Sequence, residues 1–262
     1  MPVDDPAPLF RLFWENSSLN RARTPGFASR LEADARRVSW KPQLFFPGAD
    51  VALARPKDKV FRIQSQRESI RQFGEKPLSP RQLGSLFAAF AARPGNKRLL
   101  PSGGGKYPVE TFALLFSVAG YPTPTVVYYN ADNHSLSRVG PCPPFGEMAM
   151  DLGILPTPHN PSTPAACFLF IIFPTRSTLK YGERGARFAL MEVGHYAQNL
   201  GLRLAQERLA GYELGGVREA RVANLLGLES ADALIALGYA VGSVLHLDLE
   251  TRVGLDQRDE AW

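Results

Sequence analysis

The sequence predicts an α+β protein in which an antiparallel-rich sheet surrounds one central, buried helix. Three apolar runs of strand length, at 109–120, 125–130 and 166–173, are separated by turns or loops and not by helices. The longest helical pattern, at 185–208, stands after them. Because the regular strand-helix alternation of a parallel doubly wound sheet is missing, the pattern favours α+β.

The N-terminal part differs in composition from the rest of the chain. Residues 8–60 mix short apolar clusters with basic segments and prolines, which predicts an irregular or small helical region without a large core of its own. We therefore divide the chain into an N-terminal extension at 1–60, which we expect to contact a partner, a main domain at 61–245 and a polar C-terminal tail at 246–262.

An amphipathic helix is predicted near the start of the main domain. It begins with Ser79 as the capping residue and Pro80 in the first turn, and it ends near 94–96. Its apolar face consists of Leu83, Leu86, Phe87 and Phe90. The turn GYPTP then joins the strands at 109–120 and 125–130, and NADNHS turns the chain towards SLSRV. These features predict an antiparallel meander.

The second half of the main domain begins with a segment rich in proline and polar residues, at 141–164, which we expect to be a loop or lid that sets substrate selectivity. After the strand at 166–173, the helix at 185–208 has apolar residues on nearly every face. It should be buried, about 36 Å long, and a candidate for the core of a homodimer. A shorter amphipathic helix at 217–228 and a closing strand at 233–242 complete the domain.

Charge and cysteine content exclude several classes of protein. The chain has a formal net charge of +5, but its 30 basic residues are dispersed, without the dense tracts of a nucleic-acid-binding protein. Cys142 and Cys167 have no metal-ligand spacing, so we expect reduced thiols and no bound metal. The start MPVDDPAPLF does not look like a signal peptide, and the apolar run at 165–174 is too short to cross a membrane. We expect a cytoplasmic protein that binds neither nucleic acid nor membrane.

The segment PSGGGKYP at 101–108 looks like a loop that holds a phosphate. A nucleotide-triphosphate loop is excluded, because Tyr107 stands where a hydroxyl residue should follow Lys106 and Pro101 replaces the first glycine. A dinucleotide-binding fingerprint is excluded too, since its glycines are spread over six positions. Either the exposed backbone N–H groups approach a flat or anionic ligand, or the segment is an ordinary loop.

Four stretches together resemble a known family. RESIR at 67–71, PSGGGKYPVE at 101–110, TLKYGERGARFALMEVGHYAQN at 178–199 and GYELGG at 211–216 occur in the order and approximate spacing of the nitroreductase-like flavoproteins. More closely, they resemble the FMN-dependent azoline dehydrogenases of thiazole- and oxazole-forming peptide synthetases, the streptolysin and microcin type. The resemblance covers roughly residues 60–242.

The resemblance implies a bound FMN and a set of residues that hold it. Two guanidinium groups and a hydroxyl would bind the phosphate, the glycine loop would contact the ring or the ribityl chain, and a backbone N–H would face flavin N5. The residues matched in this way are Arg67, Ser69, Arg71, Ser102, Gly103, Gly104, Gln198, Leu214 and Gly215. Taken without the resemblance, the two arginines read as solvated surface charges, Gln198 as a helix-to-helix contact and GYELGG as a plain turn.

The resemblance also implies a catalytic pair, Lys180 and Tyr181, which the family uses to take a proton. A lysine is a base near neutral pH only when burial or neighbouring positive charge lowers its pKa. Arg176, Arg184 and Arg187 are near enough in sequence to provide that charge. Without the resemblance, Lys180 would read as a surface lysine.

The implied activity is the oxidation of thiazoline or oxazoline rings to thiazoles or oxazoles in a ribosomally synthesised, post-translationally modified peptide of the bacteriocin kind. Flavin N5 would accept the hydride, and oxygen would reoxidise the flavin. The implied partners are the precursor peptide, a YcaO-type cyclodehydratase with the other synthetase subunits, and a second copy of the chain. Two alternatives remain: an NAD(P)H-dependent nitroreductase or flavin reductase, and a non-catalytic scaffold subunit of the synthetase.

Two positions depart from the family pattern. Lys106 stands where the family usually has an apolar residue, and Ala186 stands where an aromatic residue often follows the glycine. The pair Glu192 and His195 has the helical spacing of a metal-binding motif, but a second such motif is missing. We therefore expect His195 to be a satisfied polar residue of the central helix or a neighbour of the cofactor.

Overall fold

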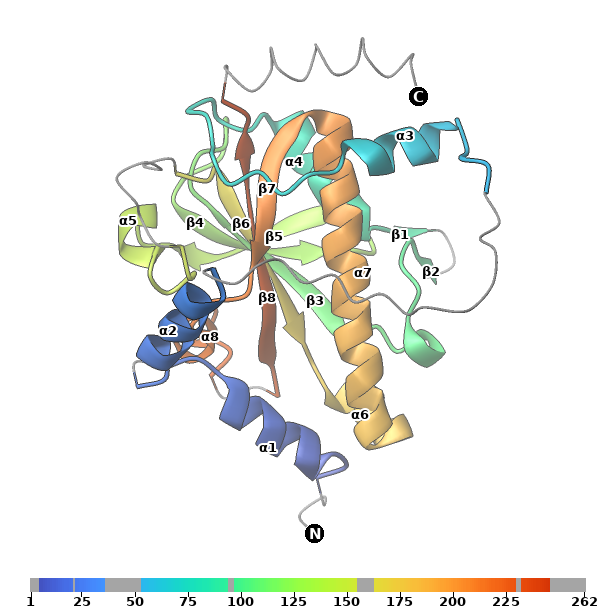
Figure 1. Ribbon diagram of the computed structural model, residues 1–262, viewed down its shortest axis with the longest axis vertical. Coiled ribbons are helices and arrows are strands. Elements are labelled where there is room, and N and C mark those ends of the chain that lie inside the picture. The colour runs from blue at the N-terminus through green and yellow to red at the C-terminus, as the bar shows by residue number, and fades with distance from the viewer. Residues whose placement is uncertain are drawn as a thin grey trace.

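The computed structural model describes residues 5–20, 22–35, 53–93, 97–154, 163–229 and 232–245. At its centre is a six-stranded sheet with the order β5-β4-β3-β6-β8-β7, in which every neighbouring pair is antiparallel (Figure 1). The strands are β3 (Val109–Leu115), β4 (Thr125–Asn130), β5 (Ser135–Pro141), β6 (Ala166–Ile172), β7 (Leu209–Leu214) and β8 (Leu234–Ser243). A separate two-stranded hairpin consists of β1 (Ala92–Arg93) and β2 (Lys97–Arg98). The predicted α+β fold and meander are confirmed.

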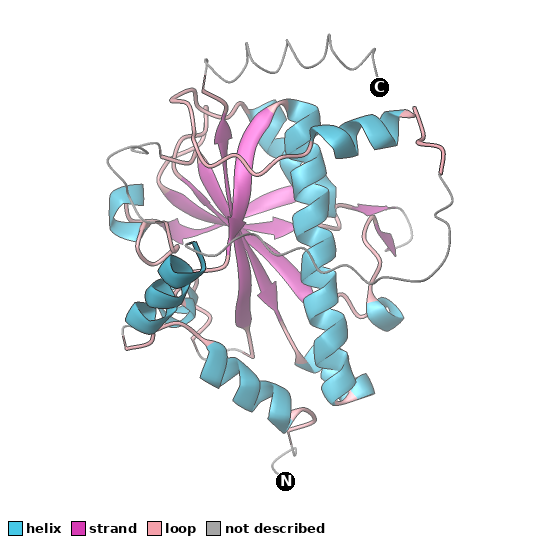
Figure 2. Ribbon diagram, in the orientation of Figure 1, coloured by secondary structure: helices cyan, strands magenta, loops and turns pink. Residues whose placement is uncertain are grey.

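Helices cover both faces of the sheet (Figure 2). The helices are α1 (Pro8–Ser17), α2 (Thr24–Ala35), α3 (Lys59–Gln66), α4 (Pro80–Phe87), α5 (Phe145–Met148), α6 (Thr175–Tyr181), α7 (Glu183–Glu207) and α8 (Glu219–Leu225). Two short 3-10 turns are η1 (Ala88–Phe90) and η2 (Gly103–Gly105). One core lies between the sheet and α4 with α7, and a second core lies between the other face and α5 with α8. None of the described helices is both long and apolar enough to span a membrane.

Strand β6 contributes to both cores. Phe168 and Phe170 face the core with α4 and α7, whereas Cys167 and Leu169 face the core with α5 and α8. All seven of its residues are buried. This position explains why the strand is a continuous apolar run and does not alternate with polar residues.

Helix α4 begins as the sequence predicts. The hydroxyl of Ser79 accepts a hydrogen bond from the backbone N–H of Gln82, and the side chain of Gln82 accepts one from the N–H of Ser79. This capping box, with Pro80 at the first helical position, satisfies N–H groups that would otherwise have no partner. Leu83, Leu86 and Phe87 are buried against the sheet.

Helix α7 packs across strands β7, β8, β6 and β3 and would be about 37 Å long at the usual rise per residue (Figure 1). The prediction that it is buried on nearly every side is wrong for the single chain. Its inner face, with Ala189 and Val193 among others, is buried, but Leu190 is 39% and Met191 is 55% exposed. The helix therefore presents an apolar strip to solvent, although its sequence suggested an interior position.

Among the elements that were not predicted, two lie next to predicted site residues. Helix α6 forms over TRSTLKY, and strand β7 forms at the free edge of the sheet. Gly211 in β7 masks the strand pattern, but a side chain cannot fit there: a β-carbon would lie 2.6 Å from Leu204 Cδ1 and 2.7 Å from the carbonyl oxygen of Ala240. Glycine lets the edge strand pass close beneath α7.

The N-terminal helix α1 is fixed to the start of α7. Both carboxylate oxygens of Glu183 accept hydrogen bonds from the first turn of α1, from Leu9 N–H at 2.8 Å and Phe10 N–H at 3.0 Å. The side chain of Phe10 is buried with Ala186. Small Ala186, where the resemblance led us to expect an aromatic residue, thus leaves room for α1. A carboxylate at a helix N-terminus also has favourable electrostatics.

Candidate active site

The glycine loop has a defined, partly left-handed backbone. Gly104 and Gly105 both have φ near 64°, and Tyr107 has φ of 45°, which is unusual for a residue with a side chain. The Ser102 hydroxyl accepts a hydrogen bond of 2.8 Å from the N–H of Tyr107, and Gly105 N–H donates to the Ser102 carbonyl. These bonds hold the loop in its strained shape.

The predicted catalytic pair lies directly against this loop. A β-carbon at Gly104 would overlap Tyr181 Oη and would lie only 3.2 Å from Lys180 Nζ. The next contact involves Gly103, where a β-carbon would lie 3.1 Å from Phe188 Cβ. Residues that are about 75 positions apart in the chain therefore meet, and glycine is required at position 104 by both its backbone angle and the lack of space.

Lys180 and Tyr181 end helix α6, and Gly182 with φ of 54° turns the chain into α7. The ammonium group of Lys180 lies 5.0 Å from the centre of the Tyr181 ring, and this ring packs edge-on against Phe188 at 5.2 Å. The Lys180 side chain is exposed. Burial, one of the two conditions under which a lysine becomes a base near neutral pH, is therefore not provided by the described part of a single chain.

Beside the pair is an open depression of about 580 Å³ with a basic lining. It is lined by Lys106, Thr175, Arg176, Leu179 and Lys180. Arg176 forms an ion pair with the buried Glu110 and donates to the carbonyl of Tyr107 at 3.0 Å, so its charge is partly balanced. Of the three arginines expected near Lys180, this one shares the depression, whereas Arg184 and Arg187 are exposed on α7.

A buried polar cluster lies beneath the glycine loop. Arg98 donates to the hydroxyl of Tyr196 at 3.0 Å, and that hydroxyl donates to the carbonyl of Val109 at 3.2 Å. Glu192, one helical turn before Tyr196, is only 2% exposed. Neither of its carboxylate oxygens has a hydrogen-bond partner among the described residues. Burial raises the pKa of Glu192 to about 7, although Ser102, Arg98 and the backbone N–H of Val109 nearby favour its ionised form.

Sequence reasoning considered Glu192 only as a possible metal ligand with His195. The structure separates the two, because Glu192 points into the protein and His195 is exposed on the outer face of α7. His195 is therefore not a buried residue of the single chain, and its alternative role as a neighbour of the cofactor stays a prediction. The signal that could have identified Glu192 is its register: it stands four residues after Phe188 and four before Tyr196, in a row that is otherwise aromatic.

The predicted phosphate-binding segment runs along the edge strand β7. Ile70 N–H donates to the carbonyl of Gly211 at 3.0 Å, and the guanidinium of Arg71 lies 5.4 Å from the ring centre of Tyr212. Arg67 lies on the other side, beside Gly201 of α7. A phosphate held by both arginines would lie at the open edge of the sheet, where Ser69 is exposed.

Leu214 and Gly215 lie at the end of the same strand. A β-carbon at Gly215 would meet no atom within 4 Å, so there is open space in front of this backbone. Gly215 follows Tyr212 by three residues, roughly 10 Å in an extended strand. The arginine segment and this open backbone are thus spaced along one strand in a way that suits an elongated ligand such as FMN. The remaining predicted cofactor contact, Gln198, is exposed on the outer face of α7.

The glycine loop lies at one end of the sheet, and strand β7 runs towards that end but stops level with Phe112 of β3. Val109 at the start of β3 pairs with Ile172 at the end of β6, which pairs with Leu234 at the start of β8. Strand β7 ends in the same direction, with Leu214 paired to Gly238. Three strand intervals separate β3 from β7, roughly 14 Å. One chain therefore presents two groups of predicted site residues and not one closed pocket.

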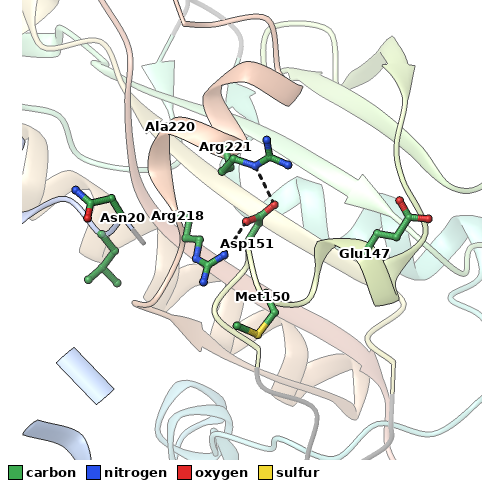
Figure 3. A pocket seen from close by; sticks show the side chains of 8 residues that line it. Asn20, Glu147, Met150, Asp151, Arg218, Ala220 and Arg221 are labelled. Carbon is green, nitrogen blue, oxygen red and sulfur yellow. Dashed lines mark hydrogen bonds and ion pairs between the residues drawn. The ribbon is translucent and has the colours of Figure 1, made fainter. Parts of the chain in front are cut away.

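A cavity of about 500 Å³ lies beyond the end of β7 (Figure 3). It is lined by Leu19, Asn20, Glu147, Met150, Asp151, Arg218, Ala220 and Arg221. Asp151 lies between Arg218 and Arg221 and accepts from each at 3.4 Å. None of the predicted catalytic or cofactor residues lines it. Its wall does include part of the segment 141–164, in which we place selectivity.

The fold and the family match define a class, the flavin oxidoreductases. The model of the nitroreductase family matches residues 65–243, and the chain belongs to this family, whose members are flavin oxidoreductases. A curated relative from Methanocaldococcus jannaschii, named as a nitroreductase, is 28% identical over 179 residues, which are 68% of this chain and 88% of the relative.

Solved structures agree with this assignment. A chain of the Escherichia coli microcin synthetase McbBCD complex, solved with truncated pro-MccB17 bound, has a TM-score of 0.64 and 25% identity and covers 83% of this chain and 82% of its own. A nitroreductase-class structure from Ralstonia eutropha has a TM-score of 0.57 and 20% identity, with 76% and 88% covered. The second likeness concerns the fold alone.

Proposed function

We propose that this protein is an FMN-dependent dehydrogenase that oxidises thiazoline or oxazoline rings to thiazoles or oxazoles in a ribosomally made peptide. The observation that carries the proposal is the meeting of Lys180 and Tyr181 with Gly104 of the glycine loop. A cationic and a phenolic group beside a loop shaped for close backbone approach suit proton removal next to a flat cofactor. The similarity to a chain of a microcin synthetase with bound pro-peptide supports a peptide substrate.

The cofactor would be held by both groups of residues. Arg67, Ser69 and Arg71 would bind the phosphate, the backbone of Leu214 and Gly215 would face the ring, and Ser102, Gly103 and Gly104 would contact the ring or ribityl chain. Bound FMN would serve as the acceptor of a hydride from the azoline ring. Because the two groups lie at different strands of one chain, we propose a homodimer in which the loop of one subunit completes the flavin site of the other.

The chain's own groups would handle the proton. Lys180 and Tyr181 would take it from the ring carbon beside the carbonyl, while the neighbouring carbon loses the hydride, so that two hydrogens leave and an aromatic ring forms. Lys180 is exposed in one chain. The second subunit and the peptide would exclude water from it and so favour its neutral, basic form. The depression lined by Lys106 and Arg176 is where we place the peptide next to the ring.

The proposed partners follow from this chemistry. A cyclodehydratase of the YcaO type must supply the azoline, and the precursor peptide must reach both enzymes, so we propose a cytoplasmic synthetase complex. The N-terminal extension is our candidate for contacts with that partner. Its helix α1 is held against α7 close to the catalytic pair, which would keep a bound partner near the site.

The test is oxidation of a synthetic azoline peptide by the purified protein with FMN under air, followed by mass spectrometry for the loss of two hydrogens per ring. We expect Lys180→Ala and Tyr181→Phe to reduce turnover strongly, because the proton acceptor is removed or weakened. Lys97→Ala, an exposed lysine of β2, is the matched control and should leave turnover unchanged. Rapid reduction of bound flavin by NADPH, with no azoline oxidation, would instead identify a nitroreductase or flavin reductase.

A further inference from the structure

The carboxyl group of Glu192 is buried, and an ionised side chain in this position destabilises the fold. It lies in the row Phe188, Glu192 and Tyr196 on the face of α7 that supports the loop. Phe188 packs on Gly103, and Tyr196 donates to the Val109 carbonyl. Glu192 lies between them, next to Ser102. A buried carboxylate without a hydrogen bond is unfavourable, and glutamine or leucine would fill the same space at lower cost.

The hydroxyl of Ser102 is a hydrogen-bond donor next to this carboxylate. The Ser102 oxygen already accepts the N–H of Tyr107, and the hydroxyl lies close enough to Glu192 to favour the ionised carboxylate. Neither oxygen of that carboxylate has a hydrogen bond in good geometry among the described residues, although the backbone N–H of Val109 also lies near it. A hydroxyl with a proton to donate and an acceptor with no partner thus lie side by side under the loop. A small shift of the loop would join them in a charge-assisted hydrogen bond.

We propose that Glu192 is a positioning residue: its carboxylate accepts the Ser102 hydroxyl and so fixes the glycine loop in the shape that receives the flavin. This inference rests on the proposed role of the loop in FMN binding. It makes the loop sensitive to protonation, because the ionised group accepts from Ser102 and the protonated group accepts more weakly.

Three other titratable groups face Glu192 from the elements packed around it. Arg98 of β2 favours the ionised form of Glu192, whereas Glu110 of β3 opposes it. The hydroxyl of Tyr196 of α7 accepts a hydrogen bond from Arg98 and donates one to the backbone carbonyl of Val109. Burial raises the pKa of Tyr196 above its ordinary value, so the phenol stays neutral throughout the range of interest. Glu192 is therefore the group of this cluster that changes charge near pH 7.

The experiment is a titration of the cofactor-free protein with FMN, followed by flavin fluorescence, at several values between about pH 5.5 and 8.5. We expect the wild-type dissociation constant to fall about tenfold as the carboxylate ionises, the size expected for one hydrogen bond to a charged group. Glu192→Gln and Ser102→Ala should both lose this part of the pH dependence. Glu207→Gln, at the far end of the same helix, should retain it. The FMN phosphate itself titrates near pH 6, but this contribution is common to all variants.

The inference is overturned if Glu192→Gln and Ser102→Ala keep the wild-type profile, or if wild-type affinity does not change across this range. Ser102→Ala leaves the carboxyl in place and provides the test even if the glutamine variant does not fold. Failure of the wild-type protein to bind FMN at any pH would overturn the proposed function as well. FMN binding with a flat profile would overturn the positioning role alone.

Discussion

Gly104 is the residue at which loop and catalytic pair come closest, and it allows a matched test. We expect Gly104→Ala to lose most FMN affinity and azoline turnover, because the added methyl group would push against Tyr181 and Lys180. Gly105→Ala is the control: it has the same positive φ but nothing within 4 Å of its β-carbon. Both changes carry a backbone cost of roughly 1–2 kcal/mol.

The measurements are the FMN dissociation constant and kcat/KM for the azoline peptide. If Gly104→Ala and Gly105→Ala change these two quantities equally, the change is caused by the strained backbone angle. The contact of Gly104 with Lys180 and Tyr181 would then not be important.

Glu192 also makes a prediction about stability. Its pKa is raised by burial from 4.5 to about 7, so the unfolded chain releases the proton at a lower pH than the folded chain. The favourable contribution of Glu192 to the free energy of unfolding is complete below about pH 4.5 and is lost as the pH rises through 7. We therefore expect Glu192→Gln to be more stable than wild type at pH 8, by on the order of 3 kcal/mol, and to have little of this gain at pH 4.5.

Urea unfolding at the two pH values measures this difference. An equal effect of the substitution at both values would show that the carboxyl group is not held in its protonated form by the fold.

At the scale of single elements, two helical glycines have opposite roles. Gly84 lies in α4, and a β-carbon there would meet nothing within 4 Å, so Gly84→Ala should raise the free energy of unfolding by about 1 kcal/mol. Gly185 lies in the first turn of α7, where a β-carbon would be 2.6 Å from the carbonyl oxygen of Ser177. Gly185→Ala should destabilise the corner between α6 and α7. Thermal unfolding of the two variants compares them, and a stabilised Gly185→Ala would show that this corner is not tightly packed.

The sequence predicted well those elements whose position is determined by residues within the element itself. The capping residues Ser79 and Pro80 locate the start of α4, and the apolar runs locate β3, β4 and β6. Strand β7 was missed because Gly211 interrupts its strand pattern. Glycine is needed there for the close contact with Leu204 of α7, and the sequence around position 211 does not show this contact. The face of α7 that carries Met191 was assigned to the interior because its apolar character was visible in the sequence, whereas its exposure in the single chain was not.

The same division holds for the site. The resemblance to azoline dehydrogenases identified Lys180 and the glycine loop, and the structure shows that they meet. The placement of Arg67 and Arg71 on two sides of β7 depends on how the segment passes along the edge strand, which motif spacing cannot predict. Glu192 was missed as a site residue because a lone acid in a helix is usually a surface residue, and its burial depends on the whole row that faces the loop.

At the scale of the whole molecule, the exposed strip of α7 around Leu190 and Met191 predicts a homodimer. We expect wild-type protein to sediment as a dimer and Met191→Glu to shift it towards the monomer and weaken FMN binding, since a charge would be buried at the contact. Val139→Glu, on an exposed apolar residue of β5, is the control and should leave the mass unchanged. A monomeric wild-type protein at micromolar concentration would contradict the dimer and the shared flavin site.

The attachment of α1 through Glu183 makes the amino-terminal helix part of the framework around the proposed catalytic pair. Tyr181, Gly182 and Glu183 are consecutive, so a force on α1 is transmitted to a point only two residues from the phenol. A fusion tag, a protease cut or a docked protein at this end would therefore act directly on the geometry of the reacting groups. Assembly with a partner could in this way change the rate of the reaction without any rearrangement of the sheet.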